Sequence, residues 1–446
     1  MEVLIIGGGF AGLAAGVALA ESGCRVHLLE QKPHLGGRAR SWIDPTTGSV
    51  VDNGQHIVMG CYHATIRFLS TIGTLDRVRF QDRLTIHFVD RKARVSRLQS
   101  FDLPSPWHLL FGVLRSGSFT FRQKLEILRS GIALGRASET ERKPQGLSVR
   151  EWLTELGQSD RLQGDFWDLL CIAALNEDPA IANAALFERV LRLALFTSPA
   201  DSCLGIARVG LSEVYVDAAA DFIRAKGGRV ECGRTVAGLR VSEGQCRGVL
   251  FSAGEQLEAE NVVSAVPSFQ LAPLLPGEVL RREPYFSALL LLRPAPIISI
   301  NLWFDRPITD LDFAGLRGAT IQWLFNKGKT TDRADGCVSL VLSGAYRHIA
   351  RSREELLATA LAELGDFFPE VRRARMLHSL VIKERFATIS PTCETEELRP
   401  ATRTPIRGLF LAGDWTATGL PATIEGAVQS GYAAAREVLE GGWGRI

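Results

Sequence analysis

The stretch that decides the fold lies at the start of the chain, where residues 2–30 read EVLIIGGGFAGLAAGVALAESGCRVHLLE. Four of its first five residues are apolar, and three of these are β-branched, which predicts a buried parallel strand. A glycine-rich turn follows, and residues 13–22 predict an alanine-rich helix. Residues 25–30 predict a second strand with an acid at its end. Strand, glycine turn, helix and strand in this order are typical of a dinucleotide-binding unit.

The glycines of this turn have the spacing G-x-G-x-x-G, as Gly7, Gly9 and Gly12. The first permits the tight turn, the second lets the backbone approach a pyrophosphate, and the third lets helix and strand pack closely. The helix N-terminus then offers free N–H groups and a positive dipole end to the phosphates. Glu30 is placed to accept hydrogen bonds from an adenosine ribose, which favours FAD or NAD over NADP.

The segment after the second strand favours FAD. Residues 35–39 read LGGRA. Gly36 and Gly37 would bring the backbone near the phosphates, and the Arg38 guanidinium would neutralise their charge. Taken alone, the two glycines fit a simple loop equally well.

A second strand–turn–helix unit lies near the C-terminus. Residues 409–412 predict a buried strand, Gly413 and Asp414 form a turn, and a helix follows. The acid of such a turn can accept a hydrogen bond from a ribityl hydroxyl. The helix start, with Thr423 and Ile424, can face the electron-rich edge of an isoalloxazine and stabilise the reduced flavin.

These segments resemble the flavin-containing amine oxidoreductase superfamily, which includes monoamine oxidases, protoporphyrinogen oxidases and phytoene desaturases. The resemblance implies an α/β fold: a split Rossmann-like FAD-binding domain with an α+β substrate domain. It also implies that Val236 contacts the adenine through its backbone. The FAD-binding domain would comprise residues 1–75, 204–268 and 396–446, and the substrate-binding domain residues 76–203 and 269–395.

Four further segments resemble hydroxysqualene dehydroxylases, also described as squalene-associated FAD-dependent desaturases. They read DNGQHIVMGCY at 52–62, LCIAALN at 170–176, NLWFD at 301–305 and GDWTATGLP at 413–421. The resemblance implies reductive removal of the hydroxyl group from hydroxysqualene, giving squalene, in bacterial squalene and hopanoid synthesis. The substrate would then be a long apolar isoprenoid. Because the sequence has no second dinucleotide fingerprint, the electrons would come from reduced nicotinamide or another external donor.

Residues 52–62 supply the candidate catalytic groups. His56 is the most attractive acid for loss of water from an allylic alcohol, because a histidine titrates near neutrality. Gln55 and Asn53 can hydrogen-bond the hydroxyl group or the flavin edge. The alternative is that all three residues hold the shape of a loop or contact the cofactor.

Three other functions stay open at this point. A carotenoid or phytoene-type desaturase also needs a flavin and a long tunnel. An amine oxidase needs an aromatic pair before the flavin, for which only Trp415 has an evident place. A non-enzymatic prenyl-binding protein of related fold needs no flavin, and the intact glycine and acid set argues against it.

Composition narrows the class of protein further. The 446 residues are 46% hydrophobic and carry a net charge of +2, without the basic cluster and stacking aromatics of a nucleic-acid binder. The eight cysteines have no zinc-like spacing, so we predict no metal site and reduced thiols in a cytoplasmic protein. No apolar run reaches the ~18 residues that a membrane-spanning helix needs.

One stretch, residues 107–136, has an unusual charge pattern. It contains five cations and the single acid Glu126, interleaved with leucines and phenylalanines. A basic amphipathic helix of this kind suits a membrane interface, here the inner face of the cell membrane. A substrate-domain helix with a solvated basic face is the other interpretation. The cations are Arg115, Arg122, Lys124, Arg129 and Arg136.

Overall fold

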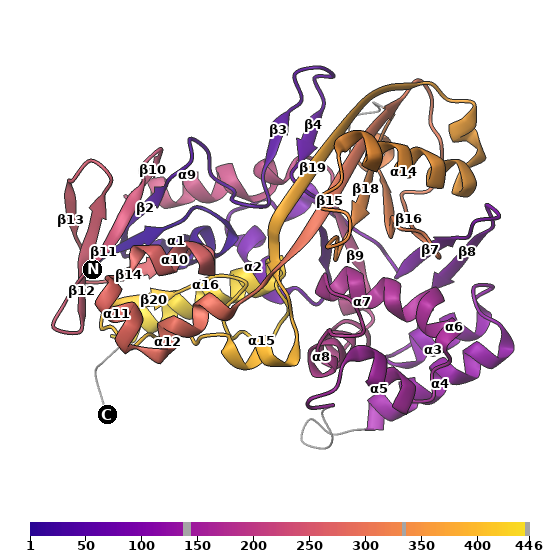
Figure 1. Cartoon of the computed structure of the whole chain (residues 1–446), viewed down its shortest axis with the longest axis horizontal. Helices are drawn as coiled ribbons and strands as arrows, with labels where there is room; N and C mark the ends of the chain where they lie inside the picture. The colour runs from indigo at the N-terminus through magenta and orange to yellow at the C-terminus, as the bar shows by residue number, and fades with distance from the viewer. Residues whose placement is uncertain (137–143, 332–335, 442–446) are drawn as a thin grey trace.

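A parallel five-stranded sheet occupies the left side of the molecule in Figure 1. The computed structural model describes residues 1–136, 144–331 and 336–441. The sheet draws its strands from the two ends and the middle of the sequence, and the exact limits of the two domains stay a prediction. The strands are β1 (Glu2–Ile6), β2 (Arg25–Glu30), β10 (Arg229–Cys232), β14 (Val262–Ser264) and β20 (Leu409–Leu411), in the spatial order β10-β2-β1-β14-β20.

Both faces of the sheet are buried at β1, β14 and β20, which explains why these three strands are mostly apolar, whereas the edge strand β10 is partly exposed. Val3 and Ile5 pack under α1 (Phe10–Glu21), α9 (Asp217–Ala225) and α16 (Ile424–Leu439). Leu4 and Ile6 face the opposite layer. That layer contains the antiparallel strands β11 (Val236–Ser242), β12 (Gln245–Phe251) and β13 (Gln256–Glu258), and the short helices α10 (Ser268–Leu271), α11 (Gly277–Arg282) and α12 (Pro284–Ser287).

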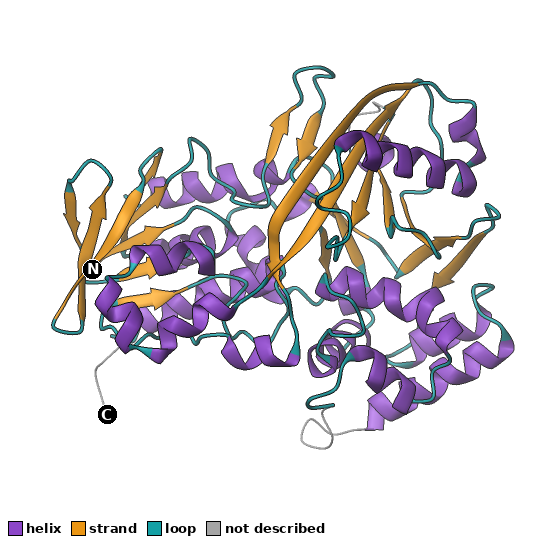
Figure 2. Ribbon diagram, in the orientation of Figure 1, coloured by secondary structure: helices purple, strands orange, loops and turns teal. Residues whose placement is uncertain are grey.

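The right side of the molecule is built on a mixed seven-stranded sheet (Figures 1 and 2). Along β15, Ile298, Ile300 and Leu302 face α14 (Arg353–Phe367), and the alternate residues face the other way. The strands, in spatial order, are β19 (Met376–Ile389), β15 (Pro294–Phe304), β18 (Cys337–Leu342), β17 (Trp323–Asn326), β16 (Phe313–Leu316), β7 (Thr85–Val89) and β8 (Val95–Gln99).

Helices gather below this sheet, on the face opposite α14 (Figure 2). They are α3 (Trp107–Arg115), α4 (Phe121–Arg136), α5 (Val149–Glu155), α6 (Asp160–Leu162), α7 (Asp168–Leu175) and α8 (Ala184–Leu195). Smaller elements join the two sides. These are β3 (Ser41–Ile43), β4 (Val50–Asp52), β5 (Ile57–Met59), β6 (Val78–Phe80), β9 (Leu204–Ala207), α2 (His63–Thr71), α13 (Lys327–Thr330) and α15 (Cys393–Leu398).

The stretch 107–136 forms two helices, so the prediction of one helix was wrong. The backbone at Ser116 is extended (φ −66°, ψ 131°), which ends α3. Its hydroxyl donates to the Arg97 carbonyl and accepts from the Ser118 N–H. These side-chain bonds stabilise a turn in place of the next helical turn.

Strand β19 is interrupted by a large bulge where it pairs with β15. Thr388 lies opposite Ala295, and Glu384 lies opposite Ile297. Three residues of β19 therefore stand against one residue of β15. Bulges re-aim side chains and are common beside active sites.

Candidate functional site

Two glycine turns face one another at the carboxyl end of β1. The Gly36 N–H donates to the Gly8 carbonyl at 2.8 Å. Gly37 has a φ of +56°, and a Cβ on it would lie 3.3 Å from the Gly9 Cα. Only glycine adopts this φ freely while leaving room for the opposite turn. The two turns therefore contact one another, and both line one cavity; we call the part of it beside these turns and the N-terminus of α1 the channel.

The channel fits the pyrophosphate of FAD. A Cβ added to Gly9 would meet no protein atom closer than the Gly37 Cα, at 4.0 Å, so the space in front of Gly9 is open. A Cβ on Gly12 would lie 1.9 Å from the Gly7 carbonyl oxygen. Gly9 thus borders a cradle that a side chain would fill, whereas Gly12 is required for packing between α1 and the turn.

Glu30 holds the first glycine turn as well as facing the cavity. Its carboxylate accepts from the Gly8 N–H and from the Lys32 N–H, both at 2.9 Å. An ionised carboxylate has about four lone-pair sites. Two of them remain free for a ligand, and the bond from Glu30 to a ribose stays a prediction.

Arg38 has its main protein partner in the second half of the site. Its guanidinium donates to the Asp414 carboxylate at 2.7 Å and to the Ala387 carbonyl at 2.6 Å. The predicted phosphate-neutralising arginine thus also ties the N-terminal turn to the C-terminal turn and to the β19 bulge. Asp414 is 7% exposed, and its predicted bond from a ribityl hydroxyl stays a prediction.

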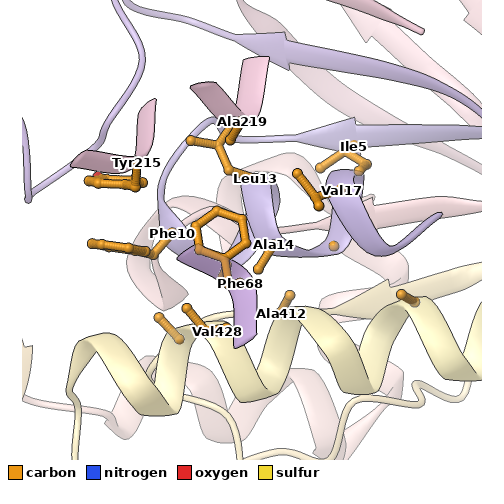
Figure 3. Close-up of a cluster of buried hydrophobic side chains, with 14 of the residues drawn as sticks. Ile5, Phe10, Leu13, Ala14, Val17, Phe68, Tyr215, Ala219, Ala412 and Val428 are labelled. Atoms are coloured by element: carbon orange, nitrogen blue, oxygen red, sulfur yellow. The ribbon is translucent and has the colours of Figure 1, made fainter. Parts of the chain in front are cut away.

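Tyr215 supports the LGGRA segment from behind, and sequence reasoning missed it. Its ring stacks on Phe10 at a centroid distance of 3.5 Å (Figure 3). Its hydroxyl lies 2.7 Å from the Gly36 carbonyl and 2.8 Å from the Ala39 carbonyl. Burial raises the pKa of Tyr215, so the hydroxyl stays protonated and donates. Nothing in the local sequence indicates this contact, because the two segments are distant in the chain.

A single cavity of about 1360 Å³ runs from the channel into the substrate side of the molecule. Every predicted cofactor residue lines it except Gly12, which lies behind the turn. A drug-sized ligand needs about 300–1,000 Å³, so this cavity has room for a cofactor and a second ligand. Beyond the channel the lining is apolar. It includes Leu84, Ile86, Leu98, Leu109, Val113, Ile127, Leu134, Phe166, Trp167, Leu170, Leu191 and Phe313.

The three predicted catalytic residues lie where the channel meets the apolar arm. The His56 Nδ1 lies 2.8 Å from the Gly54 carbonyl, so it must carry a hydrogen and donate. Burial lowers the pKa of His56, which leaves Nε2 as an acceptor in the neutral ring. The Asn53 amide donates to the Arg38 carbonyl at 2.9 Å. Within the described residues Gln55 makes only a long bond of 3.5 Å, to the His56 carbonyl, so its amide is available to a ligand.

Other polar side chains at this end of the cavity were not predicted. Ser299 points from β15 toward Gly54, and its Oγ lies 3.7 Å from where a Gly54 Cβ would be. Glu384 and Thr388 flank the β19 bulge and line the cavity. An alternating strand with one serine gave a weak signal for Ser299. Glu384 and Thr388 had no signal in the sequence, because the sequence does not show which residues a bulge displaces.

A buried ion pair lies beside this polar end. The Lys327 Nζ of α13 lies 2.9 Å from the Asp52 carboxylate of β4. The other Asp52 oxygen accepts from the Ser41 hydroxyl at 2.7 Å and from the Leu211 N–H at 3.0 Å. Both side chains are less than a tenth exposed. The pair therefore joins the segment that carries His56 to the seven-stranded side of the molecule.

Helices α3 and α4 separate the apolar arm from the surface. Val113, Ile127 and Leu134 line the cavity and are buried. The outward side chains of the same helices leave a large apolar surface. We call it the α3–α4 patch: Trp107, Phe111, Leu114, Phe121, Leu125 and Ile132, of which Phe121 is 78% exposed.

Neither a membrane-spanning helix nor a metal cluster is found in the described part of the chain. No helix there is long and apolar enough to cross a bilayer. No group of three or more His, Cys, Asp and Glu side chains among those residues is placed to hold a metal ion.

Comparison with known proteins agrees with this geometry. A family model for flavin containing amine oxidoreductases matches residues 10–439. The chain is 31% identical over 451 residues to hydroxysqualene dehydroxylase of Rhodopseudomonas palustris, covering 99% of both proteins. It is 26% identical over 469 residues to 15-cis-phytoene desaturase of Solanum lycopersicum, covering 99% of this chain and 78% of the relative.

Solved structures share the architecture. The crystal structure of an oxidoreductase from Methanosarcina mazei superposes with a TM-score of 0.77 at 17% identity, covering 99% of this chain and 100% of that chain. The likeness confirms the predicted fold, a split α/β dinucleotide-binding part joined to an α+β part.

Proposed function

Because the chain belongs to the flavin containing amine oxidoreductase family and is an FAD-dependent oxidoreductase, we propose that it removes the hydroxyl group of hydroxysqualene to give squalene. The cavity carries this proposal, since it joins an FAD cradle to a long apolar arm through a short polar end. The similarity to hydroxysqualene dehydroxylase along 99% of both chains supports it.

The reaction balances with a reduced flavin as the two-electron donor. The carbon–oxygen bond breaks, the hydroxyl group takes up a proton and leaves as water, and a hydride replaces it on carbon. The hydride would come from the flavin in its two-electron-reduced form, bound in the cradle. An external donor such as reduced nicotinamide then has to restore the reduced cofactor.

The side chains around the polar end supply the rest of the chemistry. The apolar arm holds the isoprenoid chain and excludes water, which protects a carbocation from hydration. We assign the role of proton donor to His56, the histidine at the junction of the channel and the apolar arm. The N-terminus of α16 lines the cavity through Thr423 and Ile424, where its dipole stabilises negative charge on the reduced cofactor.

An anaerobic single-turnover experiment tests the function. Photoreduced holoenzyme is mixed with hydroxysqualene, flavin reoxidation is followed by absorbance, and squalene is sought by mass spectrometry. Reoxidation with squalene formed is the expected result. The relatives at 26% identity favour a second candidate, phytoene desaturation. A flavin that stays reduced with hydroxysqualene, while the oxidised enzyme dehydrogenates phytoene, would select that candidate.

His56→Ala is expected to retain FAD and to lower turnover about 100-fold, the effect of losing a general acid. Burial lowers the pKa of His56 below its ordinary 6.5, so the protonated form becomes populated only as the pH falls. Wild-type turnover should therefore rise between pH 7.5 and 6, and the variant should lose this rise. His63→Ala is the matched control, since His63 also lines the cavity but bonds Asp201. Unchanged turnover in His56→Ala would refute the role.

We also propose that the α3–α4 patch contacts a lipid bilayer, the source of so apolar a substrate. The patch lies on the outer side of the helices that wall the apolar arm. Three exposed cations, Arg115, Arg122 and Arg129, lie on the same helices and would meet anionic headgroups. Leu193 of α8 lines the cavity and is 38% exposed, so the cavity wall reaches the surface at this residue.

The double variant Trp107→Ser, Phe121→Ser should bind vesicles of phosphatidylglycerol and phosphatidylcholine roughly tenfold more weakly than wild type, since two apolar anchors are lost. Sedimentation with the vesicles measures the binding. Ile43→Ser is the control, because Ile43 is 67% exposed on β3, outside the patch. Equal loss in both variants, or no binding by wild type, would contradict membrane contact through this patch.

A further inference from the structure

Thr388 lies at the border between the FAD cradle and the apolar arm. It follows Ala387, whose carbonyl accepts from Arg38. The β19 bulge ends at Thr388, where the strand pairs again with Ala295 of β15. Its side chain lines the cavity. The bulge thus brings a hydroxyl group to the wall of a largely apolar space.

The direction of this hydroxyl group is fixed by Asn176, at the end of α7. The Asn176 Oδ1 accepts from the Gly344 N–H at 2.7 Å, and its Nδ2 donates to the Ala295 carbonyl at 3.3 Å. The Gly344 N–H and the Ala295 carbonyl therefore fix which side-chain atom of Asn176 is the oxygen and which is the nitrogen. The same Nδ2 donates to the Thr388 Oγ1 at 2.8 Å. The Thr388 oxygen must accept here, which leaves its own hydrogen to donate elsewhere.

No acceptor for the Thr388 hydrogen lies among the residues that the structure describes. A hydroxyl group in an apolar cavity is costly unless a ligand or water satisfies it. An all-hydrocarbon substrate offers it nothing. An alcohol offers an oxygen that can accept.

The support behind Thr388 is rigid. Asn176 adopts a left-handed backbone conformation (φ +55°) that few non-glycine residues adopt. The neighbouring Glu177 is fully buried, and its carboxylate accepts from Tyr346 and Ser390, each at 2.5 Å. These bonds tie the end of α7 to the end of β19. Such a network orients a polar side chain before the ligand arrives.

We propose that Thr388 donates a hydrogen bond to the oxygen of the substrate and, with Asn176 as its positioning residue, selects a hydroxylated isoprenoid over the corresponding hydrocarbon. This inference rests on the proposed function and adds a specificity residue to it. The interaction forms in the ground state, so binding to the oxidised holoenzyme reveals it without turnover.

The test compares the affinities of hydroxysqualene and squalene for oxidised holoenzyme, from changes in tryptophan fluorescence and the flavin spectrum. Wild type should prefer the alcohol. Thr388→Val keeps the shape of the side chain, and we expect it to weaken hydroxysqualene binding about five- to tenfold, the value of one hydrogen bond, while squalene binding is unchanged. Thr388→Ser should restore the preference, and Asn176→Ala should reduce it.

Three results would overturn the proposal: equal weakening for both ligands, no weakening for the alcohol, or faster release of FAD from Thr388→Val, which would assign the hydroxyl group to the cofactor. The single-turnover experiment distinguishes failure of the Thr388 proposal from failure of the proposed dehydroxylation. Squalene formed by wild type with no change of preference in Thr388→Val refutes only the role of Thr388. Absence of squalene refutes the proposed function.

Discussion

Gly9→Ala is expected to fold like wild type and to bind FAD about 100-fold more weakly. The added methyl group meets no protein atom within the channel, and Gly9 has an ordinary φ of −85°. It would occupy the space in which backbone N–H groups reach the pyrophosphate. Losing one or two hydrogen bonds to a charged group costs about 1.5–3 kcal/mol each, which gives a loss of this size.

Two measurements distinguish this from a folding defect. Thermal unfolding of the apoprotein should be unchanged in Gly9→Ala, while titration with FAD, followed by quenching of flavin fluorescence, should show the weaker binding. Gly12→Ala is the matched control, because its methyl group would collide with the Gly7 carbonyl. That variant should lose both stability and FAD. Wild-type FAD affinity in Gly9→Ala would mean that the phosphates lie elsewhere.

Asp52→Ala is expected to lower the free energy of unfolding of the holoenzyme by about 3–5 kcal/mol, because it leaves the Lys327 ammonium buried without its partner. Urea unfolding followed by circular dichroism measures the loss. Asp312→Ala removes an exposed carboxylate that pairs with Arg79 and Lys329, and it should cost less than about 1 kcal/mol. A small loss in both variants would show that the buried ammonium finds water or another acceptor.

The contribution of Asp52 should also depend on pH. Burial by itself would raise the pKa of Asp52, but the Lys327 charge and the bonds from Ser41 and Leu211 lower it below 3.8 overall. A carboxyl group with a lower pKa in the folded state stabilises the protein above the unfolded pKa and loses this effect as the pH falls. The difference in stability between wild type and Asp52→Ala should therefore be constant near neutrality and shrink below about pH 4.

The nucleotide half of the site could be predicted because its signals are local. The Gly7, Gly9 and Gly12 spacing and the acid at Glu30 fall within one strand–turn–helix–strand unit, where backbone sterics dictate the residue types. The C-terminal turn at Asp414 had the same kind of signal. Its partnership with Arg38 was not predicted, since the pairing depends on how β20 enters the sheet beside β14.

The substrate half gave fewer signals. Tyr215 and Thr388 act through contacts with distant segments, and Thr388 reaches the cavity only because β19 contains a bulge. Residue types alone do not reveal such pairings. The stretch 107–136 had the composition of one helix, yet two side-chain bonds at Ser116 divide it. Its apolar outer face was nevertheless expected from the sequence pattern.

The position of β14 between β1 and β20 sets the order in which this protein can mature during synthesis. β1 and its glycine turn leave the ribosome before the other strands of the sheet, but β20, Asp414 and α16 come about 400 residues later. At ordinary translation rates this delay is roughly 20–80 s. During that time the turn has no partner across the cofactor, and β14, once it has been made, keeps an open edge until β20 follows. The nascent chain therefore acquires a complete FAD site only after β20 and α16 have been made, and a ribosome that stops between β14 and β20 releases a chain with an unpaired parallel strand, exposed to aggregation.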